Sequence, residues 1–80
     1  MLCLGIESTA HTFASSVTDY SDHSHKPVIV SDVRSAYIAP AGSGIHPREA
    51  SRHHASVSAR IIDEALRLGG IKCADLSIVA

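Results

Sequence analysis

One carboxylate and the short polar side chains after it have the residue types and spacing of a turn that handles phosphate. Glu7 follows the apolar run Met1–Ile6, so it lies at the end of a predicted buried strand. An acidic residue in that position can orient a cation or a reacting group. Ser8 and Thr9 come next, and their short side chains leave backbone N–H groups open to a phosphate. The alternative is that Glu7 is a solvated carboxylate in a turn.

Two arginines and a histidine form a second group at the start of a predicted helix. Arg48 and Arg52 lie one turn apart near the helix N-terminus, where the helix dipole disfavours cations. A bound anion would remove that conflict, whereas two solvated surface arginines would need no ligand. His54 lies on the apolar side of the same helix, where a histidine is either a hydrogen-bonded core residue or a ligand.

Histidines are frequent, with 6 among 80 residues, but their spacing does not predict a metal site. His53 and His54 are two candidate ligands, and the polar turn Asp22-His23-Ser24-His25 is another small group. A zinc ion needs three or four ligands, so we expect no metal site within this chain. The sequence also contains no P-loop, no G-x-G-x-x-G motif and no nucleophile elbow.

Length and charge restrict the class of protein. The 80 residues suffice for one small domain, and 7 Lys and Arg against 8 Asp and Glu exclude a module that binds nucleic acid by bulk positive charge. The apolar runs are too short to span a bilayer, and the apolar start lacks the cationic stretch of a signal peptide. Cys3 and Cys73 lack the spacing of a disulfide framework, which favours a reduced, cytoplasmic setting. The apolar end, Leu76–Ala80, resembles a strand cut short, so we interpret the chain as a fragment.

The elements that must position these residues are three strands, a helix and a final strand. They are predicted at residues 1–6, 11–17, 28–38, 47–68 and 76–80. The first strand is apolar enough to be covered on both faces, residues 7–10 and 19–27 are expected to be turns, and Ser31-Asp32 marks a bulge or an early strand end. Pro47 suits a first helical position and Gly69-Gly70 a helix end. A right-handed crossover then places the last strand parallel to the first.

The apolar side chains of the predicted helix occupy an arc of about 200°, wider than the ~100° that one packing partner needs. One stripe is expected to pack on the sheet, and its members are Ala50, His54, Val57, Ile61, Ala65 and Leu68. A second stripe is expected to face another helix, from the rest of the protein or from a separate subunit, and its members are Ala55, Ala59, Ile62 and Leu66.

Three segments resemble the archaeal and eukaryotic branch of the TsaD/OSGEP family, formerly called glycoproteases. Residues 2–12 are similar to its opening motif, L-G-(I/L/F)-E-(S/G)-(T/S)-A, and residues 44–54 to its second motif, G-(I/F)-x-P-R-(E/D)-A-x-x-H-H. Residues 75–80 are similar to the strand D-(I/L)-x-x-(I/V)-A that precedes the family's S-x-G-P-G loop. Two departures concern the second strand: Ala14 stands where members usually have Gly, and the turn at 19–27 is longer.

The resemblance implies an α/β fold, in which residues 1–80 are the first part of the N-terminal lobe of an actin/hexokinase-like (ribonuclease-H-like) ATPase, in the order β-β-β-α-β. It implies that the whole protein transfers threonylcarbamoyl from its adenylate to N6 of adenosine 37 in tRNAs that read ANN codons. The residues that match the motifs are Glu7 as a candidate catalytic residue, and Ser8, Thr9, Arg48 and His54 as residues adjacent to substrate or phosphate.

The resemblance also implies an iron or zinc ion, an adenylate or ATP ligand, and the KEOPS complex with its kinase-like and small dimer-forming subunits. The family's metal ligands, an H-x-x-x-H motif and an Asp, lie beyond Ala80, so the isolated chain is expected to hold no metal and to be inactive. The small subunit is the expected partner of the stripe from Ala55 to Leu66. Two alternatives are a non-catalytic, TsaB-like docking module of the same fold and an unrelated actin-like kinase, whose first turn would usually carry D-x-G-(T/S).

Overall fold

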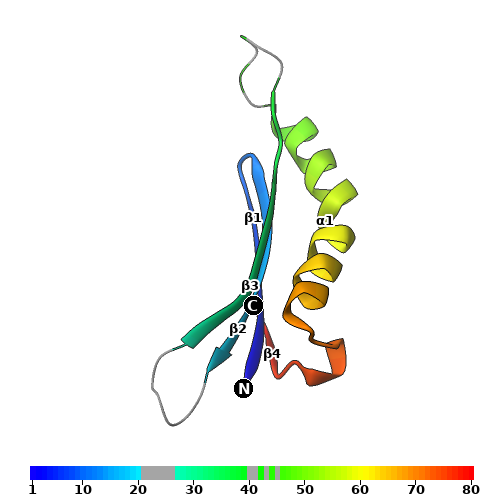
Figure 1. The fold of residues 1–80 in the computed structure, drawn as a ribbon. Coiled ribbons are helices and arrows are strands. Elements are labelled where there is room, and N and C mark those ends of the chain that lie inside the picture. The colour runs from blue at the N-terminus through cyan, green and yellow to red at the C-terminus, as the bar shows by residue number, and fades with distance from the viewer. Residues whose placement is uncertain (21–26, 40–41, 43, 45) are drawn as a thin grey trace.

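The computed structural model, which describes residues 1–20, 27–39, 42, 44 and 46–80, has one helix packed on a four-stranded sheet (Figure 1). Its elements are β1 (Leu2–Thr9), β2 (Thr12–Tyr20), β3 (Pro27–Ala36), α1 (Pro47–Gly69), the short 3-10 helix η1 (Cys73–Asp75) and β4 (Ile78–Val79). The predicted order of three strands, a helix and a strand is confirmed, as is the α/β class of an incomplete actin-like N-terminal lobe.

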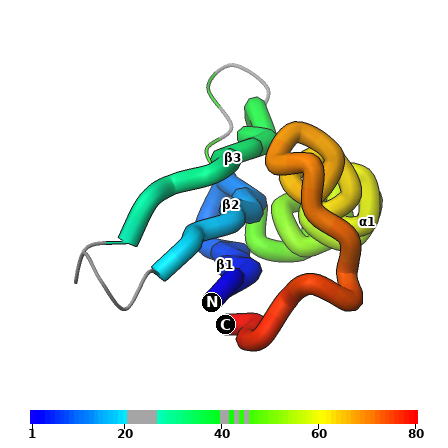
Figure 2. Tube along the Cα trace, turned by 60° about the horizontal axis from the view of Figure 1, so that its bottom comes forward, coloured from blue at the N-terminus to red at the C-terminus, as the bar shows by residue number. Residues whose placement is uncertain are grey.

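The sheet has the strand order β3-β2-β1-β4, with β4 parallel to β1 and the other pairs antiparallel. Figure 2 shows α1 along one side of β1, β2 and β3, and the chain returning past its end to the edge of β1. Backbone hydrogen bonds from Ser77 N to Leu2 O (2.8 Å) and from Ile6 N to Ala80 O (2.7 Å) attach the last segment there. The predicted parallel return of the last strand is therefore confirmed, although β4 itself covers only two residues.

The first hairpin is tighter than predicted. Glu7, Ser8 and Thr9 belong to β1, because their backbones pair with residues 14, 13 and 12 of β2 in a continuous antiparallel ladder. The loop is reduced to Ala10-His11, with Ala10 at a φ of 33°. The predicted polar turn at residues 7–10 is wrong, since cross-strand pairing outweighs the polarity of these side chains.

The second hairpin contains the predicted irregularity, displaced by one residue. Val17 pairs with Ser31 and Thr18 pairs with Ile29, so Val30 has no residue opposite and forms a β-bulge next to the predicted position. The strands extend to Tyr20 and from Pro27, so the predicted loop at 19–27 is wrong at both ends. Its centre, residues 21–26, lies outside the described residues.

Helix α1 has the predicted limits to within one residue. Pro47 occupies the first turn, where its missing N–H costs nothing. Gly70 ends the helix in the left-handed conformation, at a φ of 66°, and its N–H donates to the carbonyls of Leu66 and Arg67. A residue with a Cβ would be strained at Gly70, which is why the glycine pair marks the helix end in the sequence.

The core lies between α1 and one face of the sheet. Leu4, Val17 and Leu66 form its buried centre, and Ile62 and Ile71 pack partly buried against them. The other face bears small or polar side chains, and within the described ranges α1 is the only helix that packs on the sheet. Coverage of the first strand on both faces stays a prediction, because the described residues cover it with a helix on one face.

The end of α1 turns a different side to the sheet than the sequence predicts. Leu66 is buried, with 8% of its surface exposed, whereas Leu68 is 61% exposed. The helix end also approaches β3 closely at Gly69, where an added Cβ would lie 3.1 Å from Val30 Cγ1. Leu66 packs against Leu4 and Val17, so the predicted positions of Leu66 and Leu68 are exchanged.

A buried hydrogen bond fixes the same end of the helix. Ser31 Oγ of β3 donates to the carbonyl oxygen of Ala65 at 2.6 Å. We expect Ser31→Ala to lower the free energy of unfolding by about 1 kcal/mol, the usual net value of such a bond. Urea unfolding measures this loss, and Ser56→Ala on the exposed side of α1 is the control. Equal midpoints for the two variants would contradict the prediction.

Candidate functional site

Alternation along β1 divides the predicted phosphate turn between the two faces of the sheet. Successive side chains of a strand point to opposite faces. Glu7 and Thr9 line a hollow on the open face, whereas Ser8 lines a hollow on the face that α1 covers. The structure therefore separates three residues that the sequence predicts to act together, and it makes two candidate sites of them.

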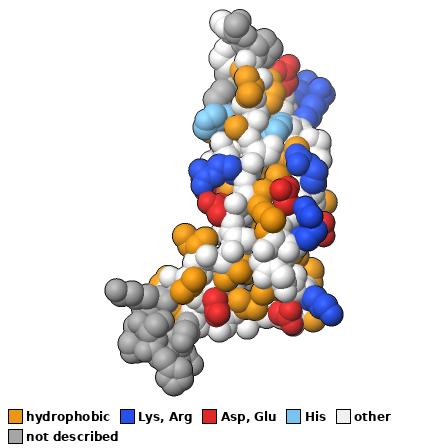
Figure 3. Space-filling model, in the orientation of Figure 1, with side chains coloured by type: hydrophobic (Ala, Val, Ile, Leu, Met, Phe, Trp, Pro, Cys, Tyr) orange, Lys and Arg blue, Asp and Glu red, His pale blue; other side chains and the backbone are white. Residues whose placement is uncertain are grey.

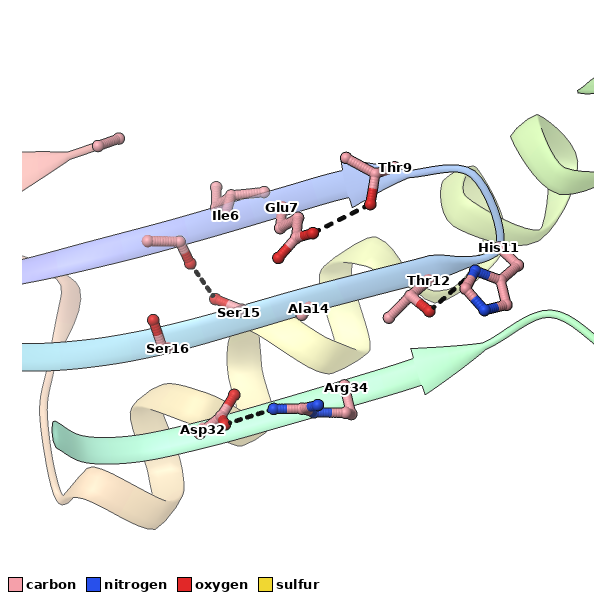
Figure 4. A pocket seen from close by; sticks show the side chains of 12 residues that line it. Ile6, Glu7, Thr9, His11, Thr12, Ala14, Ser15, Ser16, Asp32 and Arg34 are labelled. Carbon is pink, nitrogen blue, oxygen red and sulfur yellow. Dashed lines mark hydrogen bonds and ion pairs between the residues drawn. The ribbon is translucent and has the colours of Figure 1, made fainter.

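The open-face hollow has a volume of about 460 Å³ and a floor of small residues, Gly5, Ala14 and Ser16 (Figure 4). Glu7 and Thr9 lie along its β1 side, and Thr9 Oγ1 donates a hydrogen bond to Glu7 Oε1 at 3.0 Å. This bond orients a carboxylate that is otherwise exposed to solvent. A bound group would thus meet a carboxylate oxygen above a floor of small residues.

The opposite side of this hollow carries charges that the sequence analysis missed. Arg34 and Asp32 of β3 form an ion pair of 2.9 Å, and both are exposed. Ala14 pairs with Glu7 on one side and Arg34 on the other, so a carboxylate and a guanidinium flank the same small residue. Exposed ion pairs contribute little to stability. Their placement suits the binding of a polar group, and only the register of β3, which the sequence does not reveal, brings them to Glu7.

The helix-side hollow has a volume of about 390 Å³ and lies between the β1–β2 turn and the first two turns of α1. Ser8 and Ala10 line it from the hairpin, and Ser51 and His54 line it from the helix. The ring of His54 lies beside the rings of Phe13 and His53, with centroids 6.1 and 5.4 Å away. Both His54 ring nitrogens are buried and have no hydrogen-bond partner among the described residues.

Arg48 and Arg52 are exposed on the first turns of α1, and neither lines one of the two hollows. His46, the N-cap residue of α1, makes no side-chain hydrogen bond to the helix. The first N–H groups of α1 therefore lack a capping partner from that side chain. Whether these arginines bind an anion or are only solvated at the surface is not decided by these contacts, so both alternatives stay predictions.

A second group at the same helix end was not predicted. Tyr37, just after β3, donates its hydroxyl to Glu49 Oε2 at 2.6 Å, and its ring lies 5.8 Å from that of His53. His53 Nε2 lies 3.3 Å from the carbonyl oxygen of Ser35, a hydrogen bond in the tautomer that places the proton on this nitrogen. These contacts hold the start of α1 against the end of β3. No sequence spacing signals them, because residues 37 and 49 are brought together by the intervening connection.

The Tyr37–Glu49 contact predicts an alkaline titration. The hydrogen bond to Glu49 raises the pKa of Tyr37 above its ordinary value of 10.0, with smaller contributions from burial and from the charge of Glu49. A raised folded-state pKa means that the bond's stabilisation is complete below the ordinary value and is lost as the pH rises through the folded value. We expect Glu49→Gln to move the ionisation of Tyr37 back toward that ordinary value. Ultraviolet difference titration against Tyr37→Phe measures it, and an unmoved midpoint would refute the assigned cause.

The histidines of the described residues do not combine into a metal centre. Across residues 1–20, 27–39 and 46–80, no three His, Cys, Asp or Glu side chains lie close enough to hold an ion. His53 faces Ser35, and His54 turns both nitrogens into the protein. The predicted turn with His23 and His25 lies outside the described residues. This part of the chain therefore does not fit the iron or zinc ion that the resemblance implies.

The second helix stripe is only partly free. Ala55 and Ala59 are exposed and Ile62 is half-buried, whereas Leu66 belongs to the core. Leu66 is therefore corrected from a partner-facing residue to a sheet-facing one, because its side chain is buried against Leu4 of β1 and Val17 of β2. Ile62 also packs partly against the core, so we call the two exposed alanines, Ala55 and Ala59, the free stripe of α1. Its role in docking stays a prediction.

The remaining surface carries both charged and hydrophobic side chains. Figure 3 shows positive and negative side chains interspersed along α1, and hydrophobic side chains toward the lower ends of β2 and β3. The exposed apolar residues there include Tyr20, Val28 and Ile29. Among the described residues, no helix combines the length and the apolar character that crossing a bilayer requires.

Comparison with known proteins agrees with the motifs. The family described as "TsaD: tRNA N6-adenosine threonylcarbamoyltransferase" matches residues 28–80. Curated proteins named tRNA N6-adenosine threonylcarbamoyltransferase are similar over nearly the whole chain. That of Hyperthermus butylicus is 47% identical over 77 residues, which are 96% of the chain. That of Pyrobaculum islandicum is 42% identical over 80 residues, and that of Methanopyrus kandleri 40% identical over 81, each covering 100% of the chain.

The matched relatives are much longer than this chain. It spans 20% of the Hyperthermus protein and 22% of the Pyrobaculum and Methanopyrus proteins. The similarity therefore concerns about one fifth of each relative.

Proposed function

Because the chain belongs to the TsaD family of tRNA N6-adenosine threonylcarbamoyltransferases, we propose that it is the N-terminal part of an enzyme with that activity. The full-length protein transfers a threonylcarbamoyl group from its adenylate to N6 of adenosine 37 of tRNA. The observation that carries the proposal is the similarity of the whole chain to proteins of that name.

The open-face hollow supports a role for Glu7 in this reaction. Its carboxylate is exposed, held by Thr9, and placed above a floor of small residues that leaves room for a ligand. A positioned carboxylate can orient a phosphate-bound cation or the reacting amine. Arg34, across Ala14, can pair with an anionic group held in the same hollow. Ser8 and His54 belong to the other hollow, so they act on a different part of the substrate or only on the fold.

In the proposed assembly, residues outside the described part of the chain would hold the metal ion, and further subunits would bind the full-length protein. An iron or zinc ion, when bound, would be held by residues that follow this part of the chain, since the described residues do not form a set of ligands. The adenylate or ATP would lie between this lobe and the rest of the protein. The KEOPS subunits, kinase-like and small, and the tRNA would assemble with the full-length protein in the cytoplasm.

The direct test is transfer by the full-length protein. Labelled threonine, bicarbonate, ATP and the enzyme that forms the adenylate are incubated with tRNA, with and without the KEOPS subunits, and modified adenosine is measured. Incorporation that depends on this protein supports the proposal. Its absence in the complete assembly, with the protein folded and bound to its partners, would favour the non-catalytic docking module instead.

The isolated 80 residues give a further expectation. We expect no transfer and no stoichiometric metal, because the described residues offer no site with three ligands. Elemental analysis of the chain after dialysis against a chelator measures the metal directly. One tightly bound iron or zinc ion per chain would contradict this expectation.

A further inference from the structure

Strand β3 forms one edge of the sheet, and within the described ranges no strand pairs with its outer side (Figure 2). The other edge is formed by β4, which pairs with β1. Helix α1 packs on one face of β3, where Ser31 contacts Ala65 and Ser35 contacts His53. An open strand edge presents backbone N–H and C=O groups with which another strand can pair.

The hydrogen bonds at the end of β3 show which of its residues offer these groups. Tyr37 N, one residue beyond the strand, donates to the carbonyl oxygen of His11, just before β2. Backbone groups point alternately to the two sides of an antiparallel strand. Residues 31, 33 and 35 therefore bond to β2, and the N–H and C=O groups of Asp32, Arg34 and Ala36 point outward.

The two charged residues on this edge define a register for a second copy of the strand. Asp32 and Arg34 are exposed and form an ion pair of 2.9 Å. When two copies of β3 run antiparallel about a two-fold axis at Val33, Asp32 of each copy lies opposite Arg34 of the other. A shift by two residues places Asp32 opposite Asp32, or Arg34 opposite Arg34, which is unfavourable. A shift by one residue sets outward against inward backbone groups, so opposite charges are matched in one register only.

Apolar side chains at the two ends of β3 are also exposed. Val28, Ile29 and Val30 precede the charged residues, and Ile38 follows the strand. In the register centred on Val33, the end of β3 in one copy lies opposite the bulge at Val30 of the other, and Ile38 is carried toward Val28 and Ile29. Removal of these side chains from water supplies affinity, whereas the charges select the partner and the register.

We propose that two copies of the protein associate through β3, as an antiparallel pair of edge strands that joins the two sheets. The contact does not depend on threonylcarbamoyl transfer. A bulge and charged residues on an edge strand can also protect it against pairing. Charges of one sign repel a second copy in every register, however, whereas Asp32 and Arg34 attract it in one register, and this favours association.

Sedimentation of the full-length protein tests this contact by exchange of charges. The unchanged protein is expected to form a reversible dimer as its concentration rises from the micromolar to the millimolar range. Asp32→Arg and Arg34→Asp are each expected to weaken the dimer about tenfold or more, because like charges then lie opposite each other. Arg52→Asp, the same reversal on exposed α1, is expected to have no effect.

Mixing the two single variants is the decisive measurement. One copy then carries two arginines and the other two aspartates, so every opposed pair is complementary and the dimer is expected to return. The double variant, with Asp32→Arg and Arg34→Asp in one chain, is also expected to dimerise. Recovery in the mixture shows in addition that each variant is folded. An unchanged protein that stays monomeric, or single variants that associate as well as their mixture, would overturn the proposal.

Hydrogen exchange locates the contact on the backbone. The outward amides of Asp32 and Arg34 are expected to exchange more slowly in the dimer than in the monomer. The inward amides of Val33 and Ser35, which β2 protects in both states, are the control. Outward amides that are already protected in the monomer would show that another part of the chain occupies this edge. Outward amides that exchange rapidly in a dimer would place the interface elsewhere, and either result would overturn the proposal.

Discussion

Replacing Glu7 by Gln in the full-length protein is expected to lower the rate of threonylcarbamoyl transfer by about 100-fold or more, the effect of losing a positioned catalytic carboxylate. The fold should be unaffected, because Glu7 is exposed and its side chain makes one described hydrogen bond, to Thr9. Transfer is measured with saturating adenylate-forming components, and thermal unfolding is measured on the same preparations. A large loss of rate at an unchanged melting temperature is the expected pair of results.

Two neighbouring substitutions serve as controls for Glu7. Asp32→Asn removes the other carboxylate of the same hollow, which is paired with Arg34, and we expect a smaller effect on transfer. Thr9→Val keeps the Glu7 carboxylate but removes the hydroxyl that orients it, so an intermediate rate is expected. If Glu7→Gln retains the full rate, the carboxylate is a solvated surface group. If that variant unfolds, its role is structural.

The sequence predicts the helix better than the site. Pro47 and Gly70 set the ends of α1 by local chemistry, a fixed φ at one end and a left-handed φ at the other, and both signals are visible in the sequence. The extent of β1 depends instead on pairing with β2. That pairing carries Glu7 to Thr9 into the strand, and the alternation of the strand then sends Ser8 to the opposite face.

The residues that surround the predicted ones could not be inferred, for the same reason. Asp32 and Arg34 reach the Glu7 hollow through the register of β3, which a bulge at Val30 shifts by one position. The Tyr37–Glu49 bond depends on how the connection after β3 places the start of α1. The motifs therefore indicate candidate residues, whereas non-local strand pairing decides which of them share a site.

The largest expected effect on assembly concerns the free stripe of α1. We expect Ala55→Glu with Ala59→Glu to weaken binding of the full-length protein to the small KEOPS subunit by about 30-fold or more, as at the centre of an interface. Both alanines are exposed, and their small size permits the close approach of another helix. The variant should keep its melting temperature, because neither alanine contributes to the buried core.

Leu66 must be left out of that test, although the helical periodicity groups it with Ala55 and Ala59. Its side chain packs against Leu4 and Val17, so Leu66→Asp would bury an unpaired charge and is expected to cost about 4 kcal/mol or more of folding free energy. Loss of binding in such a variant would report unfolding. A suitable control is Ser56→Glu with Arg60→Glu, on exposed positions of the same turns of α1. If both double variants bind equally well, the interface lies elsewhere, and the free stripe only flanks the contact between α1 and the sheet.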